Sequence, residues 1–130
     1  MIFVDSNVPM YLVGGPHPNR DRAEAFLRGH SGEDYATSAA VYQEILHRYA
    51  AIDRRSAAED AFRLLDVMVR SVFPIARDDI DTARAVAVRY PMVSARDCLH
   101  LALMETHRIR RILTFDRGFS AYPGVTCHPM

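Results

Sequence analysis

The sequence contains no lysine, so all 16 of its positively charged residues are arginines. Walker-type phosphate loops, Schiff-base enzymes and phospho-aspartate receivers each require a lysine amine, and this chain can form none of them. The net charge is zero, because 16 acidic residues balance the 16 arginines. A global positive field is therefore excluded as the means of attracting a polyanion, and any nucleic-acid site must be local.

Cysteines and long apolar runs are also scarce. Cys98 and Cys127 are the only cysteines, and their spacing fits neither a zinc site nor a disulfide framework. We expect both to be packing residues in a reducing compartment. Apolar runs such as residues 101–104 are far shorter than the roughly 18–20 residues that cross a bilayer, and no charged-then-apolar leader precedes the first motif. We expect a soluble cytoplasmic protein without a membrane partner.

The length and the amino-acid composition are typical of one globular domain. The chain has 130 residues, of which 49% are hydrophobic and 25% charged, and it contains no internal repeat or linker. This length is close to the commonest size of a single domain and too short for two ordinary ones. We therefore expect residues 1–130 to form one domain with a packed core.

Short runs of β-branched and aromatic residues alternate with helical patterns. Strands are expected at residues 2–4, 34–37, 72–75 and 111–115, and helices at residues 8–13, 20–28, 39–52, 61–69, 78–89 and 95–107. In the third helix, an apolar stripe that ends at Ile52 is expected to face the core. Since parallel strands need crossover connections, the alternation predicts a three-layer α/β/α sandwich with a mostly parallel central sheet.

Four acidic residues are placed where such a fold collects functional groups, outside the carboxyl ends of its strands. Asp5 and Asp116 each follow a predicted strand directly. Asp97 lies in the first turn of a helix, and Glu44 lies about two turns into the helix that begins near Ser38. We expect these four carboxylates to line one cleft.

Each acid also has a structural explanation. Asp5 could form an Asx turn, Asp97 completes the capping-box pattern that begins three residues earlier, and Asp116 could cap a short helix. Glu44 and Arg48 have the i,i+4 spacing of an ion pair on a solvated helix face. His100 shares a helix with Asp97, and a structural or exposed role is favoured over a role as ligand or base.

Carboxylates gathered in one cleft repel one another unless a cation lies among them. Mg²⁺ or Mn²⁺ is the expected partner, because these ions favour oxygen ligands and can activate water for attack on a phosphodiester. Asp5 and Asp97 are assigned as direct ligands and Asp116 as a further metal residue. Glu44 is expected to complete the site or to hold the attacking water.

Four blocks of the sequence contain the four acids. They are Val4-Asp5-Ser6-Asn7-Val8, Thr37-Ser38-Ala39-Ala40-Val41-Tyr42-Gln43-Glu44, Ser94-Ala95-Arg96-Asp97-Cys98-Leu99-His100 and Thr114-Phe115-Asp116-Arg117-Gly118-Phe119. In this order and at these intervals, the blocks resemble the motifs of PIN-domain ribonucleases. The chain length and the third and fourth blocks are similar to VapC toxins of bacterial toxin–antitoxin pairs.

The resemblance implies a metal-dependent endoribonuclease that acts as the toxin of a toxin–antitoxin pair. It implies that the family's acidic quartet is Asp5, Glu44, Asp97 and Asp116, and that small polar residues near the metal are Asn7, Ser38 and Thr114. The implied partners are an RNA substrate, a cognate antitoxin, and a second copy of the chain that docks through the helices around residues 39–49 and 57–68. Cleavage by activated water would leave a 5′-phosphate and a 3′-hydroxyl.

RNA must be held locally, and four arginines lie near the last predicted strand. Arg117 is the preferred phosphate ligand, because it follows Asp116 directly. Arg108, Arg110 and Arg111 could also bind phosphates, although basic residues at the end of a helix equally well complement its dipole.

Two other functions compete with this interpretation. A haloacid-dehalogenase-like phosphatase also places an aspartate after its first strand, but Asn7 replaces its second aspartate and the chain has no lysine. A catalytically silent PIN-like module that binds RNA or protein remains the alternative. Retention of four acids argues against it, because clustered charge without a partner costs stability.

Overall fold

The computed structural model describes residues 1–129, and its centre is a five-stranded sheet in which all strand pairs are parallel. The strand order is β3-β2-β1-β4-β5. The strands are β1 (Ile2–Val4), β2 (Tyr35–Ser38), β3 (Ser71–Phe73), β4 (Arg111–Leu113) and β5 (Thr126–His128). Chain reversal between neighbouring parallel strands requires crossovers, and helices supply them, as the alternating sequence pattern predicts.

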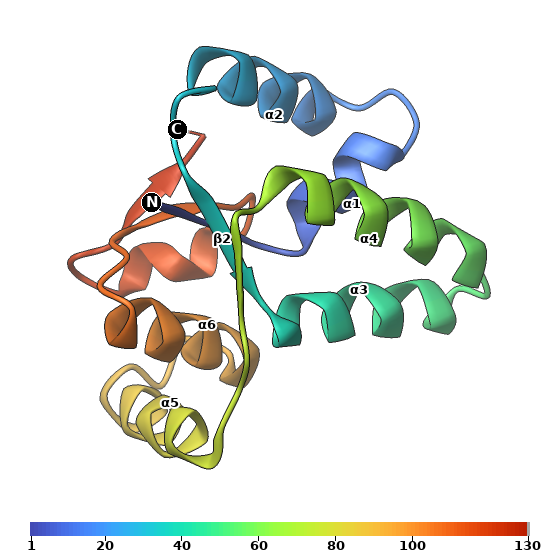
Figure 1. Ribbon diagram of the computed structural model, residues 1–130. Coiled ribbons are helices and arrows are strands. Elements are labelled where there is room, and N and C mark those ends of the chain that lie inside the picture. The colour runs from blue at the N-terminus through green and yellow to red at the C-terminus, as the bar shows by residue number, and fades with distance from the viewer. Residues whose placement is uncertain (130) are drawn as a thin grey trace.

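Six α-helices flank the sheet, which confirms the predicted α/β/α class. They are α1 (Asn7–Val13), α2 (Pro18–Gly29), α3 (Ala39–Ala51), α4 (Arg55–Met68), α5 (Arg77–Arg89) and α6 (Ala95–Thr106), followed by the 3₁₀ helix η1 (Arg117–Ala121). Helix α2 lies on one side of the sheet, whereas α5 and α6 lie together on the other (Figure 1). No helix within residues 1–129 has the length and apolar character needed to span a membrane.

The middle of the sheet is the core of the protein. All three residues of β1 are completely buried, and Phe3 is in register with Ala36 of β2 on one side and Ile112 of β4 on the other. A strand covered on both faces has no need of polar alternation, which is why β1 reads as a continuous apolar run. The core therefore fixes where β1, β2 and β4 end, and the residues that follow them emerge at a common edge.

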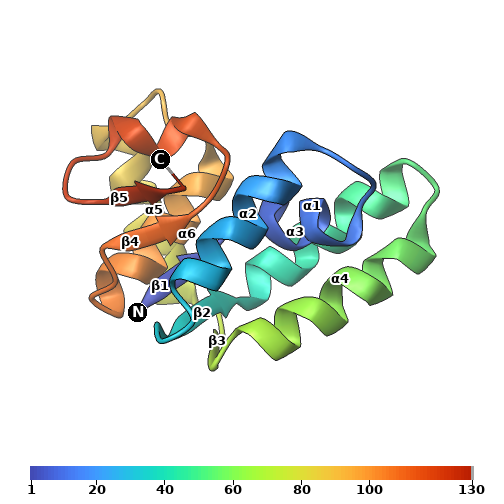
Figure 2. The same ribbon diagram turned by 90° about the horizontal axis from the view of Figure 1, so that it is seen from above.

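Helices α1, α3 and α4 pack together beyond this carboxyl edge (Figures 1 and 2). Helix α3 starts directly after β2, with Ser38 as its N-cap residue. Helix α1 starts two residues after Asp5, which itself follows β1. The first turns of α1 and α3 are thereby held next to the ends of the two central strands.

Two expectations about the fold are wrong in detail. Strand β5 was not predicted, because it follows a Pro-Gly turn and lies at the sheet edge with Thr126 exposed, so it has no buried apolar run. Ile52 does not face the core but is 60% exposed, because α3 ends at Ala51 and the chain turns there toward α4. Neither difference moves the strand ends that carry the acidic residues.

Candidate active site

Asp5 lies where the chain leaves β1 for α1, and it is 3% exposed. Its Oδ1 accepts a hydrogen bond from the backbone N–H of Ser6 at 2.7 Å, and its Oδ2 accepts one from the hydroxyl of Thr114 at 2.7 Å. Because Thr114 follows the neighbouring strand β4, this bond joins two strand ends. Burial raises the pKa of Asp5 above its ordinary value, although His100 and Thr114 act in the opposite direction.

Glu44 reaches the same place from the second turn of α3 and is also buried. The hydroxyl of Ser6 donates to its Oε1 at 3.0 Å, and the Arg96 guanidinium lies 3.8 Å from the same oxygen. The solvated pair with Arg48 is therefore not what the structure shows. Glu44 follows Val41 by three residues and so shares the buried face of the helix rather than the exposed one.

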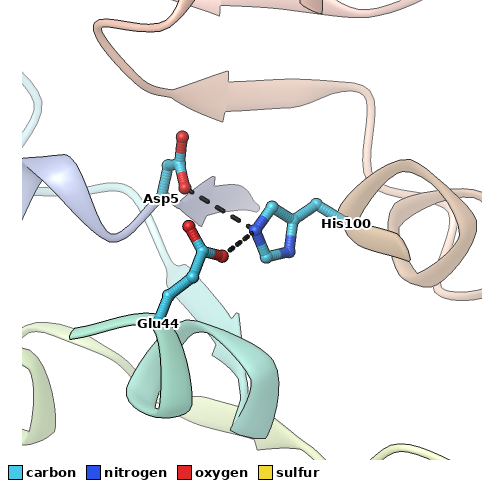
Figure 3. Close-up of side chains that lie close together, drawn as sticks. All are labelled: Asp5, Glu44 and His100. Atoms are coloured by element: carbon cyan, nitrogen blue, oxygen red, sulfur yellow. Dashed lines mark hydrogen bonds and ion pairs between the residues drawn. The ribbon is translucent and has the colours of Figure 1, made fainter. Parts of the chain in front are cut away.

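His100 of α6 connects the two carboxylates (Figure 3). Its Nε2 donates to Oε2 of Glu44 at 2.7 Å and lies 3.7 Å from Oδ1 of Asp5. The ring is 1% exposed, with the ring centroids of Phe3 and Phe119 at 5.5 and 6.3 Å. Burial alone would lower the pKa of His100, but the hydrogen bond to Glu44 and the charges of both acids raise it above the ordinary value.

The contact with His100 also changes the pKa of Glu44. Burial would raise the pKa of Glu44, but the hydrogen bond and charge of His100, together with Ser6 and Arg96, lower it below its ordinary value. Nδ1 of His100, on the far side of the ring, has no hydrogen-bond partner within residues 1–129. The histidine therefore directs a single donor into the site, and Glu44 receives it.

Asp97 and Asp116 approach each other across Gly118. A Cβ atom at Gly118 would lie 3.1 Å from Oδ1 of Asp116 and 3.5 Å from Oδ2 of Asp97. Asp97 is 6% exposed in the first turn of α6, where its backbone N–H donates to the Ser94 hydroxyl at 3.3 Å. Burial raises the pKa of Asp97 to about 7, and the charges of Asp116 and Asp5 act in the same direction.

Asp116 itself is exposed and caps η1, accepting the backbone N–H of Gly118 at 2.8 Å. The predicted capping roles of Asp97 and Asp116 are thus present together with the predicted convergence. A cap uses the backbone amide or one carboxylate oxygen, and a second oxygen remains for another partner.

Gly118 leaves room between these two carboxylates, which leads to a prediction. We expect Gly118→Val to push Asp97 and Asp116 apart and to weaken Mn²⁺ binding by roughly tenfold to a hundredfold, as loss of orientation around a metal typically does. Gly118→Ala should have a smaller effect, because one methyl group meets only carboxylate oxygens that can shift by a few tenths of an ångström. Calorimetric titration measures the Mn²⁺ affinity of each variant. Equal affinity of the wild type, Gly118→Ala and Gly118→Val would contradict the prediction.

Three further predicted residues surround the acids. Thr114 accepts the backbone N–H of Asp116 at 3.0 Å and the amide of Asn7 at 3.5 Å, while Asn7 Oδ1 accepts the N–H of Phe115 at 3.3 Å. Ser38 is completely buried at the end of β2; it is the N-cap residue of α3, but its hydroxyl makes no capping hydrogen bond and has no partner within residues 1–129. Asn7 and Thr114 thus tie β1 to β4 directly behind Asp5 and Asp116.

The predicted arginines separate into two groups. Arg117 is exposed beside Asp116 at the carboxyl edge. Arg111 begins β4, and its guanidinium lies 2.6 Å from Oε1 of Glu33. Because β4 runs from Arg111 toward Asp116, Arg108, Arg110 and Arg111 all lie toward the amino edge, away from the acids. For Arg108 and Arg110, which follow the end of α6, this position favours the alternative role at the helix end over phosphate binding beside the acids.

The donor chemistry of the cluster suits a divalent cation. Carboxylate oxygens are the ligands that Mg²⁺ and Mn²⁺ favour, and both Asp5 oxygens keep a lone pair free beyond their one hydrogen bond. Burial and the charges of Asp116 and Asp5 raise the pKa of Asp97, and His100 acts against them. The ligand atoms of Asp5, Glu44 and His100 lie within 4.8 Å of one another, so the tightest group differs from the predicted set Asp5, Asp97 and Asp116.

His100 is the residue that sequence reasoning missed. It was expected to be structural or exposed, yet its Nε2 lies 2.7 Å from Glu44 and 3.7 Å from Asp5, between two of the four acids. A signal was present in the sequence, because His100 follows Asp97 by three residues on a helix and must share its face. Periodicity could not single it out, because α6 is buried on nearly all sides.

The sequence matches the PIN domain family over residues 2–125. It is 50% identical over 127 residues to ribonuclease VapC13 of Mycobacterium tuberculosis, which covers 96% of this chain and 97% of that protein. The crystal structure of Mycobacterium tuberculosis VapC20, described as a Sarcin-Ricin loop cleaving toxin, has a TM-score of 0.83 at 26% identity and covers 99% of this chain and 100% of that one.

A toxin–antitoxin complex from Klebsiella pneumoniae shares the fold, with a TM-score of 0.71 at 19% identity over 97% of this chain and 96% of that one. All four acids, and the sequence blocks that contain them, lie inside the region matched to the PIN domain. The chain therefore belongs to the PIN-domain family and, within it, to the VapC ribonucleases.

Proposed function

We propose that this ribonuclease is a single-domain endonuclease that hydrolyses RNA with Mg²⁺ or Mn²⁺ held by Asp5, Asp97 and Asp116. The observation that carries the proposal is the convergence of carboxylates from β1, α3, α6 and the end of β4. Burial, and then repulsion from Asp116 and Asp5, raises the pKa of Asp97 to about 7. Such repulsion disfavours the folded protein unless the site is used for a cation. A divalent ion there supplies a water of lowered pKa and stabilises charge on the phosphoryl oxygens.

The surrounding residues have separate tasks in this proposal. Ser6 and Thr114 each donate one hydrogen bond to an oxygen of the Asp5 carboxylate. These bonds fix the orientation of the carboxylate and therefore the direction of its remaining lone pairs. Ser6 and His100 hold Glu44 in the same manner. Glu44 is therefore a fixed acceptor for the proton of an attacking water, with a pKa below its ordinary value that keeps it ionised. Attack by water on the phosphorus, with breakage of the bond from phosphorus to the 3′-oxygen, would leave a 5′-phosphate and a 3′-hydroxyl.

Cleavage assays with the purified protein test the proposal. We expect cleavage of single-stranded RNA to stop in EDTA, to return with Mg²⁺ or Mn²⁺, and to leave 5′-phosphate ends. Asp5→Asn should remove both cleavage and Mn²⁺ binding by calorimetry, whereas Asp60→Asn, on the exposed face of α4, should change neither. Undiminished cleavage in EDTA would exclude metal dependence. Absence of Mn²⁺ binding by the wild type would instead favour a catalytically silent binding module.

Two partners follow from the same proposal. The Klebsiella pneumoniae neighbour was solved as a toxin–antitoxin complex, which supports a cognate antitoxin for this chain. Leu46 of α3 and Val67 of α4 are 45% and 84% exposed, and apolar side chains on these helices support the proposed homodimer. An RNA substrate and two free cysteines agree with a cytoplasmic location.

A further inference from the structure

A cavity of about 360 Å³ opens directly beside the acids. Its wall includes Thr114 and Asp116, so it is continuous with the site where the phosphodiester would be cleaved. The remaining lining comes from α2 and from the segments around η1 and β5, namely Asn19, Arg22, Phe115, Arg117, Ser120, Cys127 and Pro129. None of these residues belongs to the proposed metal site, so their chemistry needs a separate explanation.

Two guanidinium groups give one side of the cavity a positive character. Arg22 donates to Oδ1 of Asn19 at 3.4 Å and to the carbonyl oxygen of Pro129 at 3.3 Å, and it forms no ion pair with any residue from 1 to 129. Arg117 makes no ion pair or side-chain hydrogen bond within residues 1–129 and is exposed. Guanidinium groups that no carboxylate neutralises are suited to the bidentate binding of phosphate.

An aromatic ring, that of Phe115, lies next to one of these charges. The guanidinium carbon of Arg22 lies 5.5 Å from the centroid of the Phe115 ring, and Tyr11 contacts the same ring edge-on at 5.3 Å. Bases of single-stranded RNA stack on aromatic rings and on arginine planes of this kind. Asn19 and Ser120 supply hydrogen-bonding groups at the same wall. The cavity thus combines phosphate, base-stacking and hydrogen-bonding chemistry in a volume suited to one nucleotide.

We infer that this cavity is a subsite for one nucleotide of single-stranded RNA adjoining the scissile phosphate, with Arg22 and Arg117 binding its phosphate and the Arg22–Phe115 pair stacking its base. The inference rests on the proposed function, because it requires RNA to lie across Asp116. It also explains how a chain of zero net charge holds a polyanion: the positive charge is concentrated at one wall beside the acids.

A larger cavity elsewhere supplies the matched control. It has a volume of about 620 Å³ and is lined by Arg108, Arg110 and Tyr122, but it shares no residue with the acidic cluster and lies toward the amino edge of the sheet. Arg110→Gln therefore removes the same charge from the same protein without touching the proposed subsite.

Binding of fluorescein-labelled octauridylate, followed by anisotropy in Mg²⁺, tests the subsite. All variants are made in an Asp97→Asn background, which the proposed function predicts to be unable to cut the probe. Between about 50 and 200 mM NaCl, Arg22→Gln and Arg117→Gln should each weaken binding about threefold to tenfold and lower the salt slope by about 0.7. Arg110→Gln should change neither the affinity nor the salt slope.

A second variant separates stacking from charge. Phe115→Leu keeps an apolar side chain at this half-buried position and should weaken binding at least about fivefold with no change in the salt slope, since stacking releases no counterions. If Arg22→Gln and Arg117→Gln match Arg110→Gln in affinity and slope, the subsite is excluded. Cleavage of the probe by the Asp97→Asn background would instead contradict the proposed function, so the two failures are distinguishable.

Discussion

Replacing Asp97 by asparagine is expected to reduce metal-dependent RNA cleavage by about a thousandfold or more while stabilising the metal-free protein. The loss follows because Asp97 is a proposed metal ligand, and removal of several kcal/mol of transition-state stabilisation corresponds to about this factor. The gain follows because Asp97 is buried against Asp116 and Asp5, whose charges oppose its ionisation. An amide of the same shape removes this repulsion and can donate a hydrogen bond to Asp116.

The stabilisation should depend on pH in a defined direction. The pKa of Asp97 is raised from 3.8 to about 7 by folding. As the pH rises through this window, the unfolded chain loses its proton first, so the wild-type fold becomes less stable with increasing pH. The raised pKa of His100 acts in the same direction above pH 6.5. In EDTA at pH 8, the free energy of unfolding of Asp97→Asn should therefore be larger than that of the wild type by on the order of 2 kcal/mol. This is less than the full pKa shift would give, because water screens part of the repulsion.

Thermal unfolding in EDTA at pH 5 and pH 8, with and without Mn²⁺, measures this effect. The midpoint of Asp97→Asn should lie several degrees above that of the wild type at pH 8 and close to it at low pH. Added Mn²⁺ should raise the wild-type midpoint and leave the variant unchanged. The exposed Asp60→Asn variant controls for charge alone. A lower midpoint for Asp97→Asn at pH 8 would show that the carboxylates do not repel one another as the structure indicates.

The sequence was sufficient to locate the four acids because their positions follow from topology. Asp5 and Asp116 come directly after strands, and parallel strands bring such residues to one edge. Asp97 in the first turn of α6 and Glu44 in the second turn of α3 follow from where those helices begin. The capping pattern at Ser94 fixed one of these starts, and the hydrogen bond from the Asp97 N–H to its hydroxyl is present.

Contacts that depend on the rotation of a helix or the direction of a strand could not be predicted. The buried face of α3 includes Glu44, whereas its i,i+4 relation to Arg48 suggested a solvated pair. Arg111 is close to Asp116 in sequence, but an extended chain advances about 3.3 Å per residue, so five residues carry them to opposite edges. Likewise Arg22 is far from Phe115 in sequence, and only the packing of α2 beside β5 and η1 makes them neighbours.

Replacing His100 is expected to distinguish a residue that positions Glu44 from one that binds metal. Metal-ligating histidines almost always donate their second ring N–H to a partner, but Nδ1 of His100 has none within residues 1–129. The geometry favours a donor role, with Nε2 at 2.7 Å from Glu44 Oε2. His100→Leu leaves Glu44 with Ser6 and the distant Arg96, and removing one member of a buried pair costs about 3–5 kcal/mol of stability.

His100→Gln is the informative partner of that variant, because its side-chain amide can offer an N–H close to the position of the lost Nε2. We expect His100→Leu to unfold at a much lower temperature and to lose cleavage activity. In His100→Gln, cleavage should recover to within about tenfold to a hundredfold of the wild type, with Mg²⁺ and Mn²⁺ affected equally. A nitrogen ligand would matter more to Mn²⁺ than to Mg²⁺. Selective loss of Mn²⁺ binding in His100→Gln, measured by calorimetry, would therefore show that the imidazole coordinates the ion and that Glu44 is held by other means.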